Sequence, residues 1–149
     1  MIHNASSKTV AKSSAAATAI DGTFTHEIDT LGFAYAAIDV LFSPFTAAVT
    51  PATLVLKLAA SDASGSGQTN LTGFVAGTDF TVVAGVTTGS GNTGHVTRFN
   101  VDLRGKARYL TVSATPKGAS IVSSVARLSR GDEAPHTATE AGVGNIVSG

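Results

Sequence analysis

The amino-acid sequence predicts an all-β domain, and three observations on the 149-residue chain lead to this class. Hydrophobic residues make up 43% of the chain and charged residues only 13%, against a typical charged fraction of about 25%, so we expect a folded core rather than disorder. Apolar and polar residues alternate in short runs, as in strands with one buried face. Turn-forming residues separate these runs, without a convincing amphipathic helix. We therefore expect a two-sheet β-sandwich, with a jelly roll of about eight strands as its leading form.

The composition divides the chain into three parts. Residues 1–20 are small and polar, with two lysines as their only charges, and we expect a flexible N-terminal arm that could include a short strand near residues 9–11. Residues 21–130 hold the alternating runs and are expected to form the sandwich. Residues 131–149 are again mostly small or polar, and we expect them to form an extended C-terminal arm.

Each expected strand follows from the order of its residues. Leu54, Leu56 and Leu58 share one face of their run, which is typical of a half-buried strand. The run 34–42 is apolar almost throughout, which predicts a more buried strand with Asp39 as its odd member. In order along the chain, the expected strands are residues 23–29, 34–42, 52–60, 71–75, 80–84, 95–103, 107–115 and 121–128.

Glycine, proline and serine mark the expected connections. Two prolines predict a loop over residues 43–51, because proline cannot donate to a central ladder. Gly105 predicts a tight hairpin in which it supplies a positive φ. The longest loops are expected at residues 61–67 and 85–94, where glycine and serine cluster.

No motif of catalytic or nucleotide-binding chemistry stands in the context that it requires. Residues 89–94 fit the spacing G-x-G-x-x-G, but a dinucleotide site needs a helix after the motif, and an alternating strand is expected there. No serine lies in a strand-to-helix elbow, and the chain has no cysteine to act as a nucleophile or to form a disulfide. We expect neither enzyme activity nor a cofactor.

Residues that could bind a metal are scattered along the sequence. The four histidines, His3, His26, His95 and His136, include no pair at metal-ligand spacing on one element. Asp62 opens a Ser/Gly loop that suggests a calcium site, but the several acidic ligands of such loops are missing. We therefore expect a plain turn at this position and no metal site.

The net charge of zero conceals a polarised chain. Residues 98–130 carry seven bases and one acid, whereas residues 1–97 and residues 131–149 each carry three more acids than bases. These bases either decorate solvent-exposed strand faces or form a surface for an acidic partner. Three of them alternate across one turn, which would place their heads close together. The candidate contacts with a partner or a neighbouring subunit are Arg104, Lys106, Arg108, Arg127, Arg130, Asp132 and Glu133.

Other partners are disfavoured by composition. The net charge is zero and few aromatic residues stand between the bases, so a nucleic-acid partner is not expected. No run approaches the roughly 18 apolar residues of a membrane helix, and the first twenty residues hold no apolar block of signal-peptide type.

Two longer blocks of sequence stand out, residues 28–40 (IDTLGFAYAAIDV) and residues 99–113 (FNVDLRGKARYLTVS). Together with residues 72–74 and 126–131, they resemble small virion proteins of tailed phages, encoded among head genes. The resemblance covers roughly residues 23–135. It implies a head decoration (cement) protein, or a related small capsid-attached protein, that assembles as an oligomer on the shell. A trimer would fit the decoration sites of many capsids.

Composition and resemblance together predict a non-enzymatic virion structural protein that binds the outside of a phage capsid and decorates or stabilises it. Its partners would be the major capsid protein and other copies of itself, at the capsid surface of the virion. The alternative is a carbohydrate- or receptor-binding β module of a phage fibre or adhesin. That alternative predicts a concave patch rich in aromatic or Asp/Asn residues near residues 61–67 and 85–94.

Overall fold

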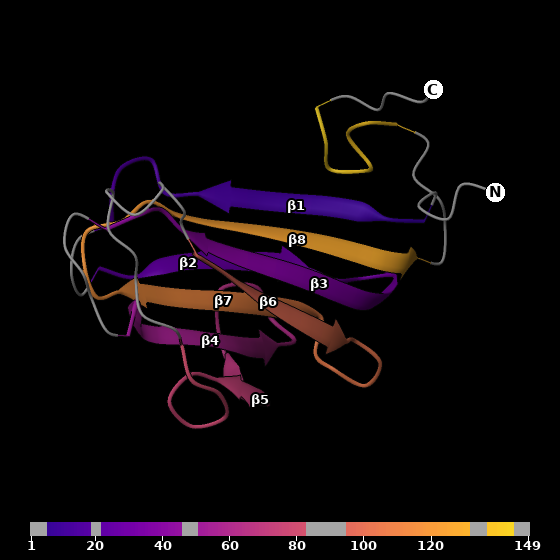
Figure 1. Ribbon diagram of the computed structural model, residues 1–149. Coiled ribbons are helices and arrows are strands. Elements are labelled where there is room, and N and C mark those ends of the chain that lie inside the picture. The colour runs from indigo at the N-terminus through magenta and orange to yellow at the C-terminus, as the bar shows by residue number, and fades with distance from the viewer. Residues whose placement is uncertain (1–5, 19–21, 46–50, 83–94, 132–136, 145–149) are drawn as a thin grey trace.

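Eight strands lie in two four-stranded antiparallel sheets in the computed structural model, which describes residues 6–18, 22–45, 51–82, 95–131 and 137–144 (Figure 1). One sheet has the order β1-β8-β3-β6 and the other the order β2-β7-β4-β5. The described residues include no helix, and hence none of the length and apolarity needed to cross a membrane. The strands are β1 (Lys8–Ser13), β2 (Phe24–Asp29), β3 (Phe33–Phe42), β4 (Thr53–Ser61), β5 (Thr69–Val75), β6 (His95–Asp102), β7 (Tyr109–Pro116) and β8 (Val122–Gly131).

The strand pairs follow the connectivity of a jelly roll. β1 pairs with β8, β2 with β7, β3 with β6 and β4 with β5, so the chain runs as one long antiparallel hairpin rolled into two sheets. Only β4 and β5 are consecutive strands within one sheet, and every other connection crosses between the sheets. The expected eight-stranded β-sandwich is confirmed.

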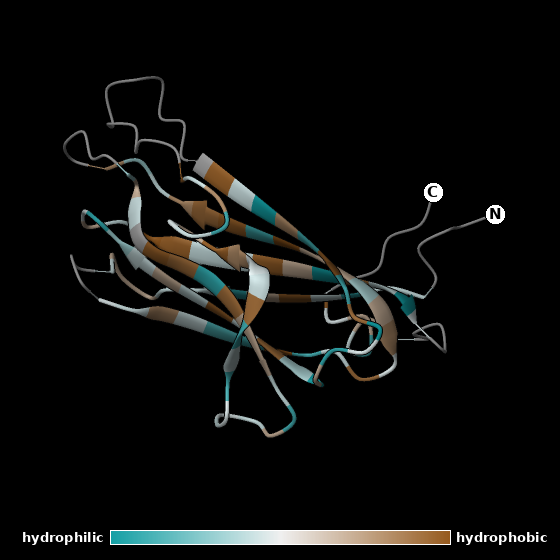
Figure 2. Cartoon of the chain, turned by 90° about the horizontal axis from the view of Figure 1, so that it is seen from below, coloured by the Kyte–Doolittle hydropathy of each residue, from teal (hydrophilic) through white to brown (hydrophobic). Residues whose placement is uncertain are grey.

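The facing sides of the two sheets form the hydrophobic core. Brown hydrophobic bands alternate with pale or teal bands along the strands in Figure 2, as the period of two requires. Burying a valine, leucine, isoleucine or phenylalanine side chain contributes about 1.5–3 kcal/mol to stability relative to leaving it exposed. Central core residues with no exposed surface include Ile38, Val40, Leu110 and Val112.

Residues 80–82, the described part of the strand expected at residues 80–84, belong to none of the eight strands. β5 ends at Val75, and Gly77 (φ 82°) donates its N–H to the carbonyl of Phe80 at 2.8 Å. The ring of Phe80 then packs edge-on against Phe99, with 5.7 Å between ring centroids. Phe80 therefore packs against the core from a turn. An apolar run in the sequence does not by itself distinguish such a turn from a strand. Residues 83 and 84 lie outside the described part.

β1 comes from the segment expected as a flexible N-terminal arm, and it is longer than the short strand expected near residues 9–11. β1 pairs with β8 over all six of its residues, from Lys8 opposite Leu128 to Ser13 opposite Ser123. β1 is an edge strand, and of its residues Val10 packs against the core. Its apolar pattern is weak for that reason, although its main chain is fully part of the sheet.

Gly105 has the expected positive φ, 74°, but the connection that it makes is not a hairpin. β6 and β7 lie in different sheets, so this turn carries the chain from one layer of the sandwich to the other. A hairpin and a turn between sheets can need the same glycine conformation. The two are distinguished by which strands β6 and β7 pair with.

The described part of the C-terminal segment, residues 137–144, is a compact turn rather than an extended arm. The N–H of Thr137 donates to Oε2 of Glu140 at 3.1 Å, and the N–H of Glu140 donates to Oγ1 of Thr137 at 3.2 Å. This reciprocal pattern is a capping box. The turn lies beside β1 (Figure 1), where the N–H of Thr9 donates to the carbonyl of Ala141 at 2.7 Å.

Candidate functional site

The outer face of the β1-β8-β3-β6 sheet carries a group of exposed apolar side chains. Leu41 on β3, Val96 on β6 and Val125 on β8 are 41%, 56% and 43% exposed. Leu41 lies directly opposite Val96, and Asp39, two residues before Leu41, lies opposite Val125. The three apolar side chains therefore share one face of the sheet. Grouped in this way, exposed apolar residues are a feature of protein-contact surfaces.

A shallow hollow of about 490 Å³ lies on the same face. Short side chains such as Ala37 leave room at its floor, and the long side chains of two arginines stand at its border. Its shape and chemistry suit an apolar group of a partner protein flanked by polar or acidic groups. The lining residues are Thr9, Ala37, Asp39, Arg98, Val125 and Arg127.

One of these arginines is neutralised across the sheet. Arg98 lies opposite Asp39 in the β3–β6 pair, and its Nε and Nη2 donate to the two carboxylate oxygens at 2.6 and 2.7 Å. These hydrogen bonds hold the pKa of Asp39 below its usual range and raise the pKa of Arg98. Because the pair is largely solvent-exposed, it orients the two side chains more than it stabilises the fold.

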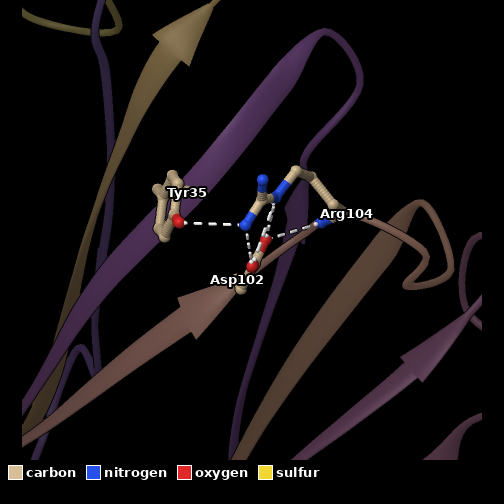
Figure 3. A network of polar contacts seen from close by, with 3 residues as sticks. All are labelled: Tyr35, Asp102 and Arg104. Carbon is tan, nitrogen blue, oxygen red and sulfur yellow. Dashed lines mark hydrogen bonds and ion pairs between the residues drawn. The ribbon is translucent and has the colours of Figure 1, made fainter.

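A second ion pair, between Arg104 and Asp102, lies at the end of the same face beside the ring of Tyr35 (Figure 3). Nη2 of Arg104 donates to Oδ2 of Asp102 at 2.6 Å and to the hydroxyl of Tyr35 at 3.2 Å. The main-chain N–H of Arg104 also donates to Oδ1 of Asp102 at 3.1 Å. Hydrogen bonds from the Arg104 side chain and then its backbone lower the pKa of Asp102 to about 2, so this carboxyl is charged at neutral pH.

Tyr35 lies within cation–π distance of two guanidinium groups. The Arg104 guanidinium lies 5.5 Å from the ring centroid of Tyr35, and that of Arg130 lies 4.9 Å from it, distances at which cations are attracted to aromatic rings. Arg130, near the end of β8, has a φ of 54°, a conformation that costs a non-glycine residue free energy. The ring contact accompanies this strained backbone and places a positive charge at the end of the face.

The structure separates bases that the sequence grouped at one turn. Arg104 is held by Asp102 on β6, whereas Arg108 donates from Nε and Nη2 to Asp29 on β2 at 2.8 and 2.7 Å. The two carboxylates belong to different sheets, so each arginine is drawn to its own layer. The hydrogen bonds from Arg108 lower the pKa of Asp29. Arg104 and Arg108 are thus largely neutralised within the chain.

The remaining predicted contacts differ in their surroundings. Arg127 and Arg130 on β8 are exposed, and no ion pair joins either of them to a carboxylate among the described residues. Lys106 is exposed in the turn between β6 and β7. The uncompensated positive charge on the outer sheet face therefore comes from β8. Asp132 and Glu133 lie outside the described residues.

Sequence reasoning missed the aromatic and apolar members of this face. Tyr35, Ala37, Asp39 and Leu41 are each two residues apart and none is buried, whereas the intervening residues from 36 to 42 are buried. The period of two was present in the sequence, but alanine on both faces hid it. Asp39, the odd member of an apolar run, was the signal that one side of this strand faces solvent.

A second hollow, of about 310 Å³, lies between the β4–β5 and β6–β7 connections. Its polar lining includes Asp62, Asn70 and Lys106, and no aromatic side chain lines it. The β4–β5 loop beside it is fixed to β2, because Ser64 Oγ and Gly65 N–H donate to the two carboxylate oxygens of Glu27 at 2.5 and 2.7 Å. Residues 85–94, the other predicted loop, lie outside the described part.

The described residues hold no group of three side chains placed to ligate a metal ion. His26 is buried, 4% exposed, and burial together with the positive charge of Lys12 lowers its pKa to about 4. Nδ1 of His26 has no hydrogen-bond partner. This is a neutral histidine of the core, not one poised for proton transfer at neutral pH. His3 and His136 lie outside the described residues.

No protein-family model matches the chain, and no curated protein matches it. Among solved structures, the chain is similar to part of BuGH86, in the crystal structure of BuGH86wt in complex with neoagarooctaose. The match covers 83% of this chain and 19% of that one, so the chain spans about a fifth of the length of that protein. The sequence identity is 11% and the TM-score is 0.42, a level of likeness that supports no assignment of function.

Proposed function

We propose that this chain is a non-enzymatic virion structural protein that binds the outside of a phage capsid and decorates or stabilises it. The observation that supports this best is the outer face of the β1-β8-β3-β6 sheet, where exposed apolar side chains lie beside uncompensated guanidinium groups. The proposed partners are the major capsid protein and other copies of this chain, in an oligomer such as a trimer at the capsid surface.

The chemistry of the face suits attachment to a large acidic surface. Leu41, Val96 and Val125 would lose their remaining water contacts on docking, which favours association. Arg127 and Arg130 would attract an acidic shell and accelerate the encounter, an effect that weakens with salt. Many copies on one lattice, linked as oligomers, would gain avidity from contacts that are individually modest.

The blocks that resemble phage head proteins overlap with this face. Residues 28–40 include most of β3, and residues 99–113 include the end of β6, the turn after it and most of β7. The network of Tyr35, Asp102 and Arg104 therefore lies entirely within the resembling blocks. Of the residues that carry the proposal, Arg127 and Arg130 also lie in a resembling segment, residues 126–131, whereas Leu41, Val96 and Val125 lie outside the resembling segments.

The alternative, a carbohydrate- or receptor-binding module, is favoured by one observation. The hollow beside the β4–β5 loop contains Asp62 and Asn70, the polar side chains that this alternative requires near residues 61–67. Its lining lacks the aromatic ring that sugar-binding sites use for stacking. We therefore rank it second.

The first test is to look for the chain in purified virions by mass spectrometry and to locate it by cryo-electron microscopy. The second is to add recombinant protein to shells that lack it and to measure how much sediments with them. Val125→Asp should lower the loading at least about tenfold, the effect of 1.4 kcal/mol. Val55→Asp is the matched control, since Val55 is 37% exposed on β4 of the opposite sheet.

Two results would contradict the proposal. Absence of the chain from virions would exclude a virion function, and the hollow beside Asp62 would then be the site to test with an array of oligosaccharides. Equal loading by Val125→Asp and Val55→Asp would show that the shell does not bind the β1-β8-β3-β6 face.

A further inference from the structure

We infer that the outer edge of β1 is a self-association surface for a second copy of this chain, and that residues 137–144, the C-terminal clasp, close this edge within each copy. The inference goes beyond the proposed function and does not depend on it, because it concerns isolated protein. It rests on the contact between the clasp and β1, on the close fit of Gly142 against Thr9, and on the register in which two copies of β1 could pair.

The clasp is seated on main-chain groups of the edge strand. The N–H of Thr9 donates to the carbonyl of Ala141 at 2.7 Å, and Ala141 is buried, 9% exposed. The capping box of Thr137 and Glu140 holds the turn in shape from within. The clasp thus satisfies an edge-strand donor that would otherwise face solvent or another chain.

Gly142 makes this seat specific. Its φ is 71°, and a Cβ added to it would lie only 1.9 Å from the carbonyl oxygen of Thr9. No real contact is that short, so a side chain at this position requires the clasp to shift away from Thr9. Gly144, two residues later, has nothing within 4 Å of an added Cβ. The two glycines form a matched pair for testing the clasp.

In the described part of the chain, the clasp covers one end of the β1 edge, at Thr9. Because successive residues of a strand alternate in the direction of their main-chain groups, Ala11 and Ser13 face the same side as Thr9, away from β8. With the clasp in place, Ala11 and Ser13 at the far end of β1 have no outward main-chain partner among the described residues. With the clasp released, three outward residues offer a full edge of six strand residues for pairing.

The sequence of β1 selects one antiparallel register with a second β1. Outward residues must meet outward residues, and the longest overlap places Ala11 opposite Ala11 and Thr9 opposite Ser13. In this register Lys12 lies opposite Val10. A shift by one outward residue in either direction brings lysines directly opposite each other, which is destabilising. The two sheets would then join into one continuous sheet across a two-fold axis.

The test compares full-length Gly142→Ala and Gly144→Ala chains. At dilutions where both are monomeric, the amide of Thr9 should exchange with solvent at least about tenfold faster in Gly142→Ala, a change equal to 1.4 kcal/mol. At higher concentration, sedimentation equilibrium should show dimers of Gly142→Ala with a dissociation constant at least about tenfold lower than that of Gly144→Ala. Adding the exposed substitution Ala11→Lys to Gly142→Ala should abolish the dimer.

Each other outcome overturns one part of the inference. Equal exchange at Thr9 in the two glycine variants would show that residues 137–144 do not protect the edge. Fast exchange at Thr9 without association would show that the free edge does not accept a second copy. A dimer that tolerates Ala11→Lys would place the self-association surface elsewhere.

Discussion

Burial of His26 makes the stability of this fold depend on pH over a defined window. The side chain enters the core from β2 and is 4% exposed. Burial, and next the charge of Lys12, lower its pKa from 6.5 to about 4. Between these two values the unfolded chain binds a proton that the folded chain does not, so the free energy of unfolding falls as the pH is lowered.

The size of the effect follows from the two pKa values. At 1.36 kcal/mol per pKa unit, a pKa lowered from 6.5 to about 4 corresponds to about 3 kcal/mol. This stability is present in full above pH 6.5 and is lost by about pH 4. The carboxyl of Asp102, with its pKa lowered to about 2, is protonated mainly below this window. His26 therefore dominates the window among the described groups with resolved pKa changes.

Urea unfolding of the native chain and of His26→Leu, followed from about pH 7 to pH 4, measures this contribution. The native chain should lose about 3 kcal/mol more than the variant over this range, because leucine has no proton to bind. A gentler change, Lys12→Gln, should retain the pH dependence but reduce it, since burial is the larger cause. Parallel curves for the native chain and His26→Leu would refute a buried, neutral histidine.

Three further predictions concern the core, the ion pair at Tyr35 and the turn between the sheets. Leu110 has no exposed surface, so Leu110→Ala should lower the free energy of unfolding, measured in urea, by about 2–5 kcal/mol. Leu31 is 66% exposed, so the control Leu31→Ala should change that free energy by less than about 0.5 kcal/mol. Similar losses in the two variants would contradict the burial of Leu110. Arg104→Gln should raise the pKa of Asp102 from about 2 toward 3.8, followed by NMR titration of the side-chain carboxyl, and an unchanged value would show that Arg104 is not its main partner. Gly105→Ala should cost about 1–2 kcal/mol, because φ is 74° and an added Cβ meets nothing within 4 Å; a neutral result would refute the left-handed conformation.

Strand positions were largely predictable, because they depend on neighbours in sequence. The expected run 95–103 and the observed β6 differ by a single residue at one end, and the expected run 34–42 lies within one residue of β3. β1 extends the short strand allowed near residues 9–11 of the expected arm to residues 8–13, and residues 80–82 of the strand expected at 80–84 belong to none of the eight strands. In both, the local pattern was ambiguous: β1 buries little because it is an edge, and Phe80 packs against the core, partly buried, without belonging to one of the eight strands.

The candidate site was less predictable than the strands. The charge count located an excess of bases between residues 98 and 130, but it could not assign partners to them. Arg98, Arg104 and Arg108 each meet a carboxylate, and for Arg98 and Arg108 that carboxylate is 59 and 79 residues away in the sequence. No ion pair joins Arg127 or Arg130 to a carboxylate among the described residues, so their positive charges are not compensated within the described part of the chain.

Residue order alone leads to an all-β sandwich with a positive φ at Gly105 and without a recognisable catalytic motif. These properties depend on periods of two and on backbone conformations, which neighbouring residues specify. Tertiary structure decided the pairing of β1 with β8, the crossing at Gly105, the seat of residues 137–144 on β1, and which arginines remain uncompensated. Each of these depends on contacts between segments far apart in the chain. Strands with similar alternation can pair in several ways, and only the packing of the whole core selects one pairing.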